Sequence, residues 1–227
     1  MPPSPKDSLQ ELRIISAQLG RNPELVQGAG GNTSIKSDGL LWIKGSGRWL
    51  ADAEKADCFV PLELQPLLEA VQNGHEDPAS FALCRELCPP GLRPSVETSL
   101  HAVMPQACVL HVHSVSAIAW GVHPQGRVLL SERLKGLPWH WIPYVRPGLP
   151  LTAEVSRALE RAPADVLVLA NHGLVVAGES PREALELLRE VESRINIAPR
   201  PFPEADIERL KRLTEGRAYR LPQDPRC

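Results

Sequence analysis

Residues 166–178 read VLVLANHGLVVAG, two short apolar runs joined by Asn171, His172 and Gly173. Apolar, branched runs on either side of a turn are typical of neighbouring strands that are buried on both faces. We therefore predict strands over 166–170 and 174–177. A histidine inside so apolar a hairpin needs a partner for its ring nitrogens, because buried polar groups are rarely left without one.

A second decisive stretch, residues 107–113, reads ACVLHVH. In a strand, the apolar residues 108, 110 and 112 would face one way, and His111 and His113 would share the other face. Two imidazoles at this spacing can bind one metal ion, but a pair of packing histidines would give the same pattern. The pair alone leaves both interpretations open.

His172 favours the metal interpretation. Three histidines with an open fourth position are the usual layout of a catalytic zinc site, whereas closed structural sites lean on cysteine thiolates. We therefore predict that His111, His113 and His172 bind one divalent metal. Zn²⁺ is the first expectation, and Mn²⁺ and Co²⁺ are the alternatives, because imidazole ligands suit several metals.

A carboxylate precedes the histidine strand. Residues 96–104 predict a helix that ends before Pro105, and Glu97 and His101 would share one face of it. We predict Glu97 as the catalytic acid and base beside the metal, with a solvated surface glutamate as the alternative. His101 is expected to be a packing histidine.

Glycine-rich loops bracket a predicted hairpin in residues 28–47, which read GAGGNTSIKSDGLLWIKGSG. The runs 33–36 and 40–44 flank Asp38-Gly39, a strong hairpin signal. No strand precedes the first loop and no helix follows it, which disfavours a dinucleotide-binding fingerprint. The backbone N–H groups of such loops suit a phosphate or a carboxylate, although ordinary turn chemistry explains the same glycines.

Apolar spacing and capping residues indicate further regular elements. We expect one more strand and five more helices, over 58–62, 9–19, 63–72, 152–161, 181–195 and 204–213. Asp7 or Ser8 is predicted to cap the first helix, and Ser180 with Glu183 forms a capping box for the long one.

Composition narrows the class of protein. The 227 residues are 43% apolar, and 25 basic residues nearly balance 27 acidic ones, which implies no general affinity for nucleic acid or acidic membranes. No signal peptide or membrane helix is recognisable, and five irregularly spaced cysteines suggest reduced thiols in a cytoplasmic protein. We expect one α/β domain over 1–200 and a proline-rich tail over 201–227.

Five ordered blocks carry a resemblance to a known family. They read GAGGNTS (28–34), IKGSG (43–47), PSVETSLH (94–101), HVHS (111–114) and ANHG (170–173). In this combination the chain resembles the class II aldolase/adducin family, which contains the zinc-dependent fuculose- and rhamnulose-phosphate aldolases. The resemblance covers about the first 195 residues.

The resemblance implies a three-layer α/β/α sandwich with a central, mainly antiparallel sheet, assembled as a homotetramer with sites at subunit interfaces. The C-terminal tail would place its short helix on the domain or on a neighbouring subunit. The family's metal ligands correspond to the three histidines above, and its proton donor and acceptor corresponds to Glu97. The predicted substrate- and phosphate-binding residues are Gly31, Asn32, Thr33, Lys44, Ser46, Gly47 and Ser95.

One departure concerns the substrate. Val96 stands where the sugar-phosphate aldolases often have a second serine, so one hydroxyl donor to phosphate is lost. Lys44 is a candidate replacement, either as a cation for phosphate or as a reader of a carboxylate.

The implied activity is metal-dependent retro-aldol cleavage of a ketose phosphate or a related sugar acid through an enediolate. The same scaffold also resembles epimerases, dehydratases and decarboxylases of sugar phosphates and sugar acids, which the three histidines do not distinguish. A non-enzymatic binding module like the adducin head is the third interpretation. It is disfavoured because all three histidines and Glu97 are present.

Overall fold

The computed structural model describes residues 5–198 and 206–218. Contacts divide the chain into two units, residues 1–197 and 198–227, and the first contains the whole sheet. In the second unit, the described residues form α9 (Ile207–Thr214), whose N-cap is Asp206. The predicted helix began at Glu204, which lies outside the described residues, and its packing stays a prediction.

A seven-stranded sheet forms the centre of the first unit, in the order β3-β2-β1-β4-β7-β6-β5. Neighbouring strands are antiparallel except β5 and β6, which are parallel. The predicted mainly antiparallel sheet is therefore confirmed. The strands are β1 (Asn32–Ser37), β2 (Leu40–Lys44), β3 (Phe59–Glu63), β4 (Cys108–Val112), β5 (Trp139–Ile142), β6 (Val166–Leu169) and β7 (Gly173–Gly178).

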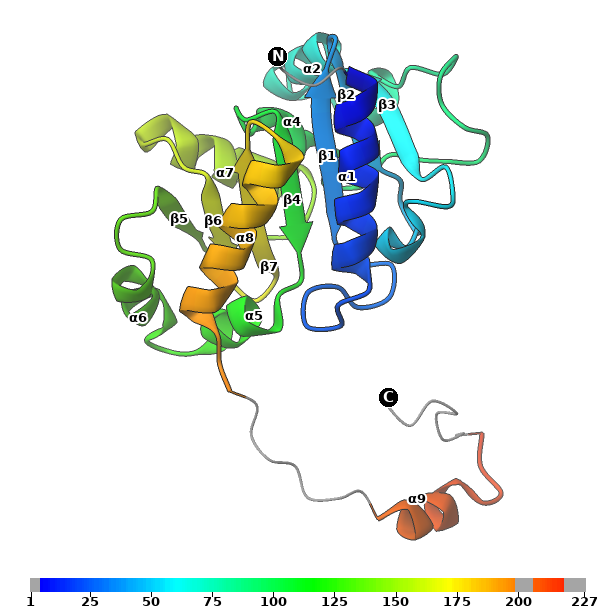
Figure 1. Ribbon diagram of the computed structural model, residues 1–227, viewed down its shortest axis with the longest axis vertical. Coiled ribbons are helices and arrows are strands. Elements are labelled where there is room, and N and C mark those ends of the chain that lie inside the picture. Colours follow the sequence, from blue (N-terminus) through cyan, green and yellow to red (C-terminus); the bar gives the residue numbers. More distant parts are fainter. Residues whose placement is uncertain (1–4, 199–205, 219–227) are drawn as a thin grey trace. The chain divides into compact units, whose positions relative to one another are not determined.

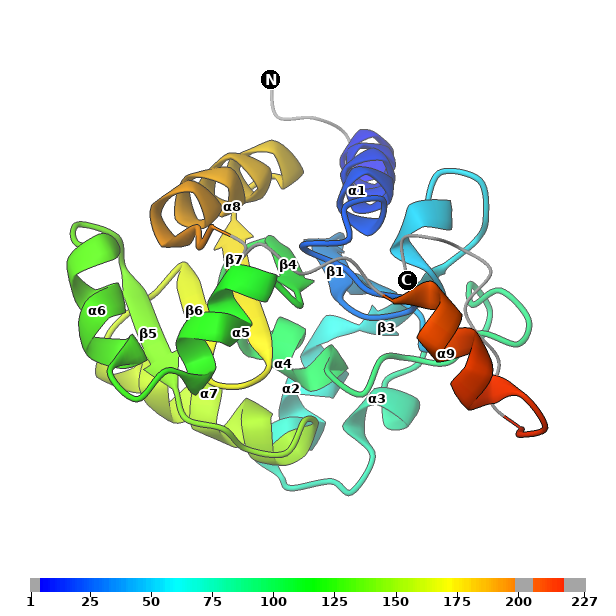
Figure 2. The same ribbon diagram turned by 90° about the horizontal axis from the view of Figure 1, so that it is seen from below.

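Helices cover both faces of this sheet, as Figures 1 and 2 show. One face packs against α1 (Pro5–Gly20), α5 (Val115–Val122), α6 (Gly126–Arg133) and α8 (Pro181–Ile195). The other packs against α2 (Leu64–Gln72), α3 (Pro78–Phe81), α4 (Thr98–Val103) and α7 (Leu149–Arg161). A single 3₁₀ turn, Leu50–Asp52, follows β2. The arrangement is the three-layer sandwich that the resemblance implied.

The central strands are apolar on both faces because both faces are covered. Leu110 and Val112 of β4 pack beneath α1, α5 and α8, whereas Val109 packs with Val175 beneath α4 and α7. Fully burying one such side chain contributes about 1.5–3 kcal/mol, so the strands β4, β6 and β7 form the most strongly stabilised part of the sheet.

The predicted hairpin is confirmed. Ser37 pairs with Leu40 at the end of β1 and β2, and the two residues between them have positive φ angles, 52° at Asp38 and 77° at Gly39. A two-residue turn of this kind matches the twist of the flanking strands, which is why Asp-Gly favours it.

Several predicted boundaries were wrong. The first helix begins at Pro5 rather than Leu9, so Asp7 and Ser8 lie within its first turn, and α7 begins at Leu149 rather than Thr152. The helix predicted from Val96 begins only at Thr98, because Ser95 already accepts the hydrogen bonds of the next turn from Glu97 N–H and from the Thr98 hydroxyl. The Ser180 cap is confirmed, but the Glu183 carboxylate accepts from Glu179 N–H rather than from Ser180.

Residues 114–148 carried no predicted element. They form α5, α6 and β5. None of the described helices is long and apolar enough to cross a membrane.

Candidate functional site

Three histidines meet at one end of the sheet. His111 lies in β4, His113 is the first residue after it, and His172 lies in the turn between β6 and β7. Because β4 pairs with β7, with His111 opposite Val175, the turn that carries His172 is held beside the end of β4. One ring nitrogen from each histidine lies within 4.8 Å of the others.

Backbone geometry around the cluster explains two residues of the motifs. Asn171 has a φ of 53°, a left-handed conformation that asparagine tolerates and that turns the chain so that His172 precedes β7. A Cβ at Gly30 would lie 2.8 Å from Nδ1 of His113. The absence of a side chain at Gly30 therefore leaves room for the His113 ring.

Glu97 lies against this cluster and is buried. Its Oε2 is 3.3 Å from Nε2 of His111, and its Oε1 is 3.4 Å from Nε2 of His172. The amide of Asn32 donates a 2.8 Å hydrogen bond to Oε2. Asn32 reaches the carboxylate because β1 pairs with β4 and places Asn32 opposite His111.

The tautomer of His111 follows from its second contact. Nδ1 lies 3.1 Å from the carbonyl oxygen of Leu174, and a carbonyl only accepts, so Nδ1 carries the proton. In the neutral ring, Nε2 then presents a lone pair to the carboxylate of Glu97. Two acceptors at this distance repel each other unless a cation, either a proton or a metal ion, lies at Nε2.

The electrostatics of the other two histidines favour the neutral form. Burial, helped by repulsion from His111 and His172, lowers the pKa of His113 to about 4. Burial likewise lowers the pKa of His172. Neutral imidazoles are the form that binds a metal.

Burial would raise the pKa of Glu97, but attraction to His111 and His172, together with the Asn32 hydrogen bond, lowers it to about 2. The carboxylate is therefore ionised at neutral pH. The attraction that lowers this pKa requires positive charge beside the carboxylate, which a proton or a metal ion on the imidazoles would supply, so the buried carboxylate needs a cation next to it.

The buried polar atoms of the cluster fit a metal ion. His111 Nε2, His172 Nδ1 and Glu97 Oε1 have no hydrogen-bond partner among the described residues. A divalent cation would satisfy such lone pairs. Three imidazoles with a nearby carboxylate suit Zn²⁺ with an open coordination position, and they also accept Mn²⁺ or Co²⁺.

His101 has a different environment, although it lies four residues from Glu97. Its ring is fully buried, and Nδ1 is 2.7 Å from the hydroxyl of Ser34 on β1. Burial lowers its pKa to about 3. His101 is therefore a core side chain packed against the sheet, as the sequence indicated.

Not all predicted substrate contacts meet at the site. The hydroxyl of Thr33 is 2.7 Å from the hydroxyl of Ser16 on α1, so it lies on the opposite face of the sheet from Asn32. Alternation along β1 explains this, because neighbouring residues of a strand face opposite ways. In this structure Thr33 holds α1 to the sheet and does not face the three clustered histidines.

Lys44 is also placed differently from the prediction of a free cation. Its ammonium donates hydrogen bonds of 2.6 Å to the carbonyl of Ala29 and 2.9 Å to that of Gly31, and the residue is only 3% exposed. Burial lowers its pKa to about 8. Lys44 thus fixes the first glycine loop, and two of its three N–H donors are already used.

Ser46 and Ser95 line a cavity of about 740 Å³. Its lining includes Val96, the residue before Glu97, but neither Glu97 nor the three histidines. Gly47 lies beside it in the same exposed loop, with a φ of 72°. Sequence reasoning missed the three arginines of the lining, Arg85, Arg93 and Arg146, because they come from loops without a motif.

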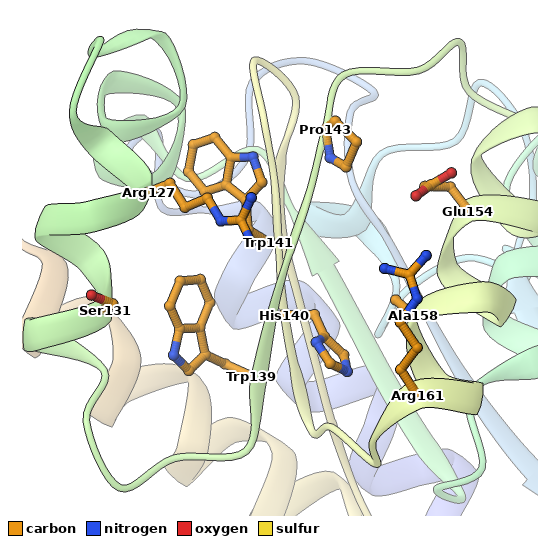
Figure 3. A pocket seen from close by; sticks show the side chains of 9 residues that line it. All are labelled: Arg127, Ser131, Trp139, His140, Trp141, Pro143, Glu154, Ala158 and Arg161. Atoms are coloured by element: carbon orange, nitrogen blue, oxygen red, sulfur yellow. The ribbon is translucent and has the colours of Figure 1, made fainter.

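A second cavity, of about 500 Å³, lies along the edge strand β5. Figure 3 shows Trp139 and Trp141 on one side of this strand and His140, Glu154 and Arg161 on the other. His140 Nε2 is 2.8 Å from the carbonyl of Ala162, and no residue of the histidine cluster lines this cavity.

The sequence matches one family model, described as the class II aldolase and adducin N-terminal domain, over residues 10–198. It is 30% identical over 205 residues to an uncharacterized oxidoreductase, YuxG, of Bacillus subtilis (strain 168). This match covers 83% of the chain but only 30% of that relative, so the chain spans less than a third of its length.

A second relative is of more similar length. The chain is 30% identical over 187 residues to a methylthioribulose-1-phosphate dehydratase of Microcystis aeruginosa, covering 73% of the chain and 82% of that protein. Among solved structures, the N-terminal class II aldolase domain of a conserved protein from Thermoplasma acidophilum is 26% identical, with a TM-score of 0.72. That match covers 86% of this chain and 95% of the other.

Proposed function

The chain belongs to the class II aldolase and adducin N-terminal domain family, and on this premise we propose that it is a metal-dependent carbon–carbon lyase. We propose Zn²⁺ as the metal, held by His111, His113 and His172, and a ketose phosphate or a related sugar acid as the substrate. The superfamily includes both aldolases and dehydratases, so the bond that is broken is the part of this proposal that needs a test.

The observation that supports the proposal most directly is the pairing of His111 with Glu97. Nε2 lies 3.3 Å from a carboxylate oxygen, and the hydrogen bond between Nδ1 and the carbonyl oxygen of Leu174 holds the ring in place, so this contact is favourable only with a proton or a metal ion at Nε2. Protonating all three clustered rings would place like charges about 5 Å apart in a buried site, with ring centroids separated by 4.9, 5.1 and 5.4 Å. A single divalent cation resolves both conflicts.

A metal bound to the histidines supplies a Lewis acid that polarises the carbonyl oxygen of the substrate. Glu97 moves the proton. In the cleavage direction its carboxylate accepts the proton of the hydroxyl whose carbon becomes the aldehyde. The carbon–carbon bond then breaks, and Glu97 returns the proton to the carbon that retains the electron pair.

The surroundings of Glu97 suit both halves of this transfer. Asn32 orients the carboxylate by donating to Oε2, and burial opposes ionisation whenever attraction to nearby positive charge is weakened. A substrate that separates Glu97 from that charge therefore raises its proton affinity, which a general base requires.

A dehydratase is the second candidate, favoured by the 30% identity to a methylthioribulose-1-phosphate dehydratase. In this reaction Glu97 would remove a proton from carbon instead of from a hydroxyl, and a carbon–oxygen bond would break with the loss of water. Epimerisation and decarboxylation use the same groups. The products distinguish these reactions, because only aldol cleavage releases an aldehyde and a second carbonyl compound.

The test combines metal content with product analysis. The purified protein and its His113→Ala variant would be assayed for bound Zn, Mn and Co, then incubated with a panel of ketose phosphates and sugar acids. About one metal per chain, lost in the variant, together with aldehyde release supports the proposal. Metal with dehydrated, epimerised or decarboxylated products supports the second candidate. Absence of stoichiometric metal would contradict both enzymatic candidates and favour a non-enzymatic binding module.

The assembly is a separate proposal. We propose a homotetramer, on the basis of the family resemblance, and sedimentation equilibrium of the full chain tests it. A monomer at micromolar concentration would contradict it.

A further inference from the structure

The cavity beside Glu97 is formed where three loops of the chain meet. The first contains Gly45, Ser46 and Gly47 after β2, the second is the segment 93–96 before Glu97, and the third is the segment 146–148 before α7. The backbone N–H of Ser46 donates a 2.9 Å hydrogen bond to the carbonyl of Arg93, which joins the first loop to the second.

The third loop is held against the second at Val96. A Cβ at Gly148 would lie 3.4 Å from Cγ2 and 3.8 Å from the carbonyl oxygen of Val96, so the backbone of the third loop lies close to Val96. Arg93 therefore enters the cavity wall from the second loop and Arg146 from the third. This arrangement does not depend on one loop alone.

The lining contains three arginines and two acids, so its formal net charge is +1. Arg85, Arg93 and Arg146 line the cavity, and none of them forms an ion pair with a carboxylate in the part of the chain that the structure describes. Two acids, Glu76 and Asp77, also line it, but Asp77 already accepts from Ser80 N–H as the cap of α3. The hydroxyls of Ser46, Ser95 and Ser99 add neutral donors.

We propose that Arg93 and Arg146 are the residues that recognise the anionic group of the substrate in this cavity. In this proposal the arginines replace Lys44 as the cations that bind the anion, because the ammonium of Lys44 already donates to the carbonyl groups of Ala29 and Gly31. They also compensate for Val96, which offers no hydroxyl donor and is 67% exposed. Guanidinium groups suit this role because they bind phosphate or carboxylate through two parallel N–H donors.

The spacing agrees with a small substrate. Ser95 precedes Glu97 by two residues, which places their Cα atoms at most about 7 Å apart. A short sugar chain spans this distance with its reacting carbons near Glu97 and its anionic end near the arginines. The choice of ligand rests on the proposed function, whereas the existence of the anion site does not.

Inorganic phosphate is the probe, titrated calorimetrically into the metal-loaded full chain. Arg93→Gln and Arg146→Gln are each expected to weaken its affinity about tenfold, since each removes a charge-assisted contact. The matched control is Arg127→Gln, which removes an exposed arginine that lines only the second cavity, and it should leave the affinity unchanged. Thermal melts of all variants would show whether the fold is retained.

The same titration with acetate distinguishes a site for phosphate from a site for carboxylate. Arginine-dependent binding of phosphate assigns a phosphorylated substrate, and arginine-dependent binding of acetate assigns a sugar acid. Either result supports the proposal. Equal affinities in all four proteins, or phosphate binding that disappears only when the metal is removed, would overturn it. If the purified chain takes up no metal but still binds phosphate in an arginine-dependent way, the anion site is supported and the proposed function is contradicted.

Discussion

The histidine cluster and the arginine-lined cavity share the segment Ser95–Glu97, yet they are constructed in opposite ways. The cluster takes His111 from β4 and His172 from the turn before β7, the strand that pairs with β4, and it takes Glu97 from the start of α4, where Asn32 of the sheet holds its carboxylate. The cavity takes its charges from three loops, and its arginines are exposed. The difference separates a candidate reaction centre, which is held by the sheet and α4, from a proposed recognition surface that is formed by loops.

The largest expected effect comes from replacing His111, which faces the cluster, and comparing the result with replacement of His101, which packs in the core. His111→Ala should lower metal affinity by more than about 100-fold, since even residues behind the ligands matter 10–100-fold. His101→Ala should keep the metal but lose about 2–5 kcal/mol of stability, because it leaves a cavity in the core. Metal analysis and denaturant titration of both variants check this. Equal loss of metal in both variants would show that the loss follows from damage to the core and not from removal of a metal ligand.

Turnover should respond to Glu97 more than to any loop residue. Glu97→Gln preserves the shape of the side chain but not its ability to accept a proton, so turnover should fall about 10²- to 10⁴-fold. Metal content should stay near one per chain. The control is Glu86→Gln, at an exposed position. Unchanged turnover in Glu97→Gln would remove Glu97 from the mechanism.

The buried histidines make stability depend on pH. The folded pKa values of His113 and His101 lie at about 4 and about 3, below the usual value of 6.5, so the unfolded chain binds more protons between these limits. The free energy of unfolding should therefore fall as pH decreases from about 6.5 to 4, by about 1.4 kcal/mol per pH unit for each proton taken up. Urea titrations of the metal-free protein at several pH values measure the slope. A flat profile would mean that these rings are charged or exposed in the folded chain.

The smallest expected effect comes from replacing Lys44, which tests whether this residue supports the first glycine loop or contacts the substrate. Lys44→Met removes two hydrogen bonds to the first glycine loop and should lower stability by about 1–3 kcal/mol. The affinity for phosphate should change less than in Arg93→Gln. If phosphate binding fell tenfold at unchanged stability, Lys44 would be a substrate contact and the cavity would extend to it.

Local patterns predicted the reaction centre better than they predicted the recognition surface. The spacing of His111 and His113, and the apolar runs around His172, indicated ligands because a strand alternates and a tight turn holds its residue in one place. Asn32 and Thr33 were both predicted to contact the substrate, but they face opposite sides of β1, so only Asn32 lies beside Glu97.

The sequence alone indicated the family, the mainly antiparallel sheet and the candidate residues of the site, because these depend on short-range spacing and on motifs that are contiguous in the chain. Only the tertiary structure decided which groups face one another. Residues 46, 93 and 146 lie far apart in sequence and have no periodicity that would link them. Strand pairing brings Asn32 to His111, the packing of α4 on the sheet brings Glu97 there, and loop packing brings Arg93 to Ser46. No local propensity records a contact between distant segments.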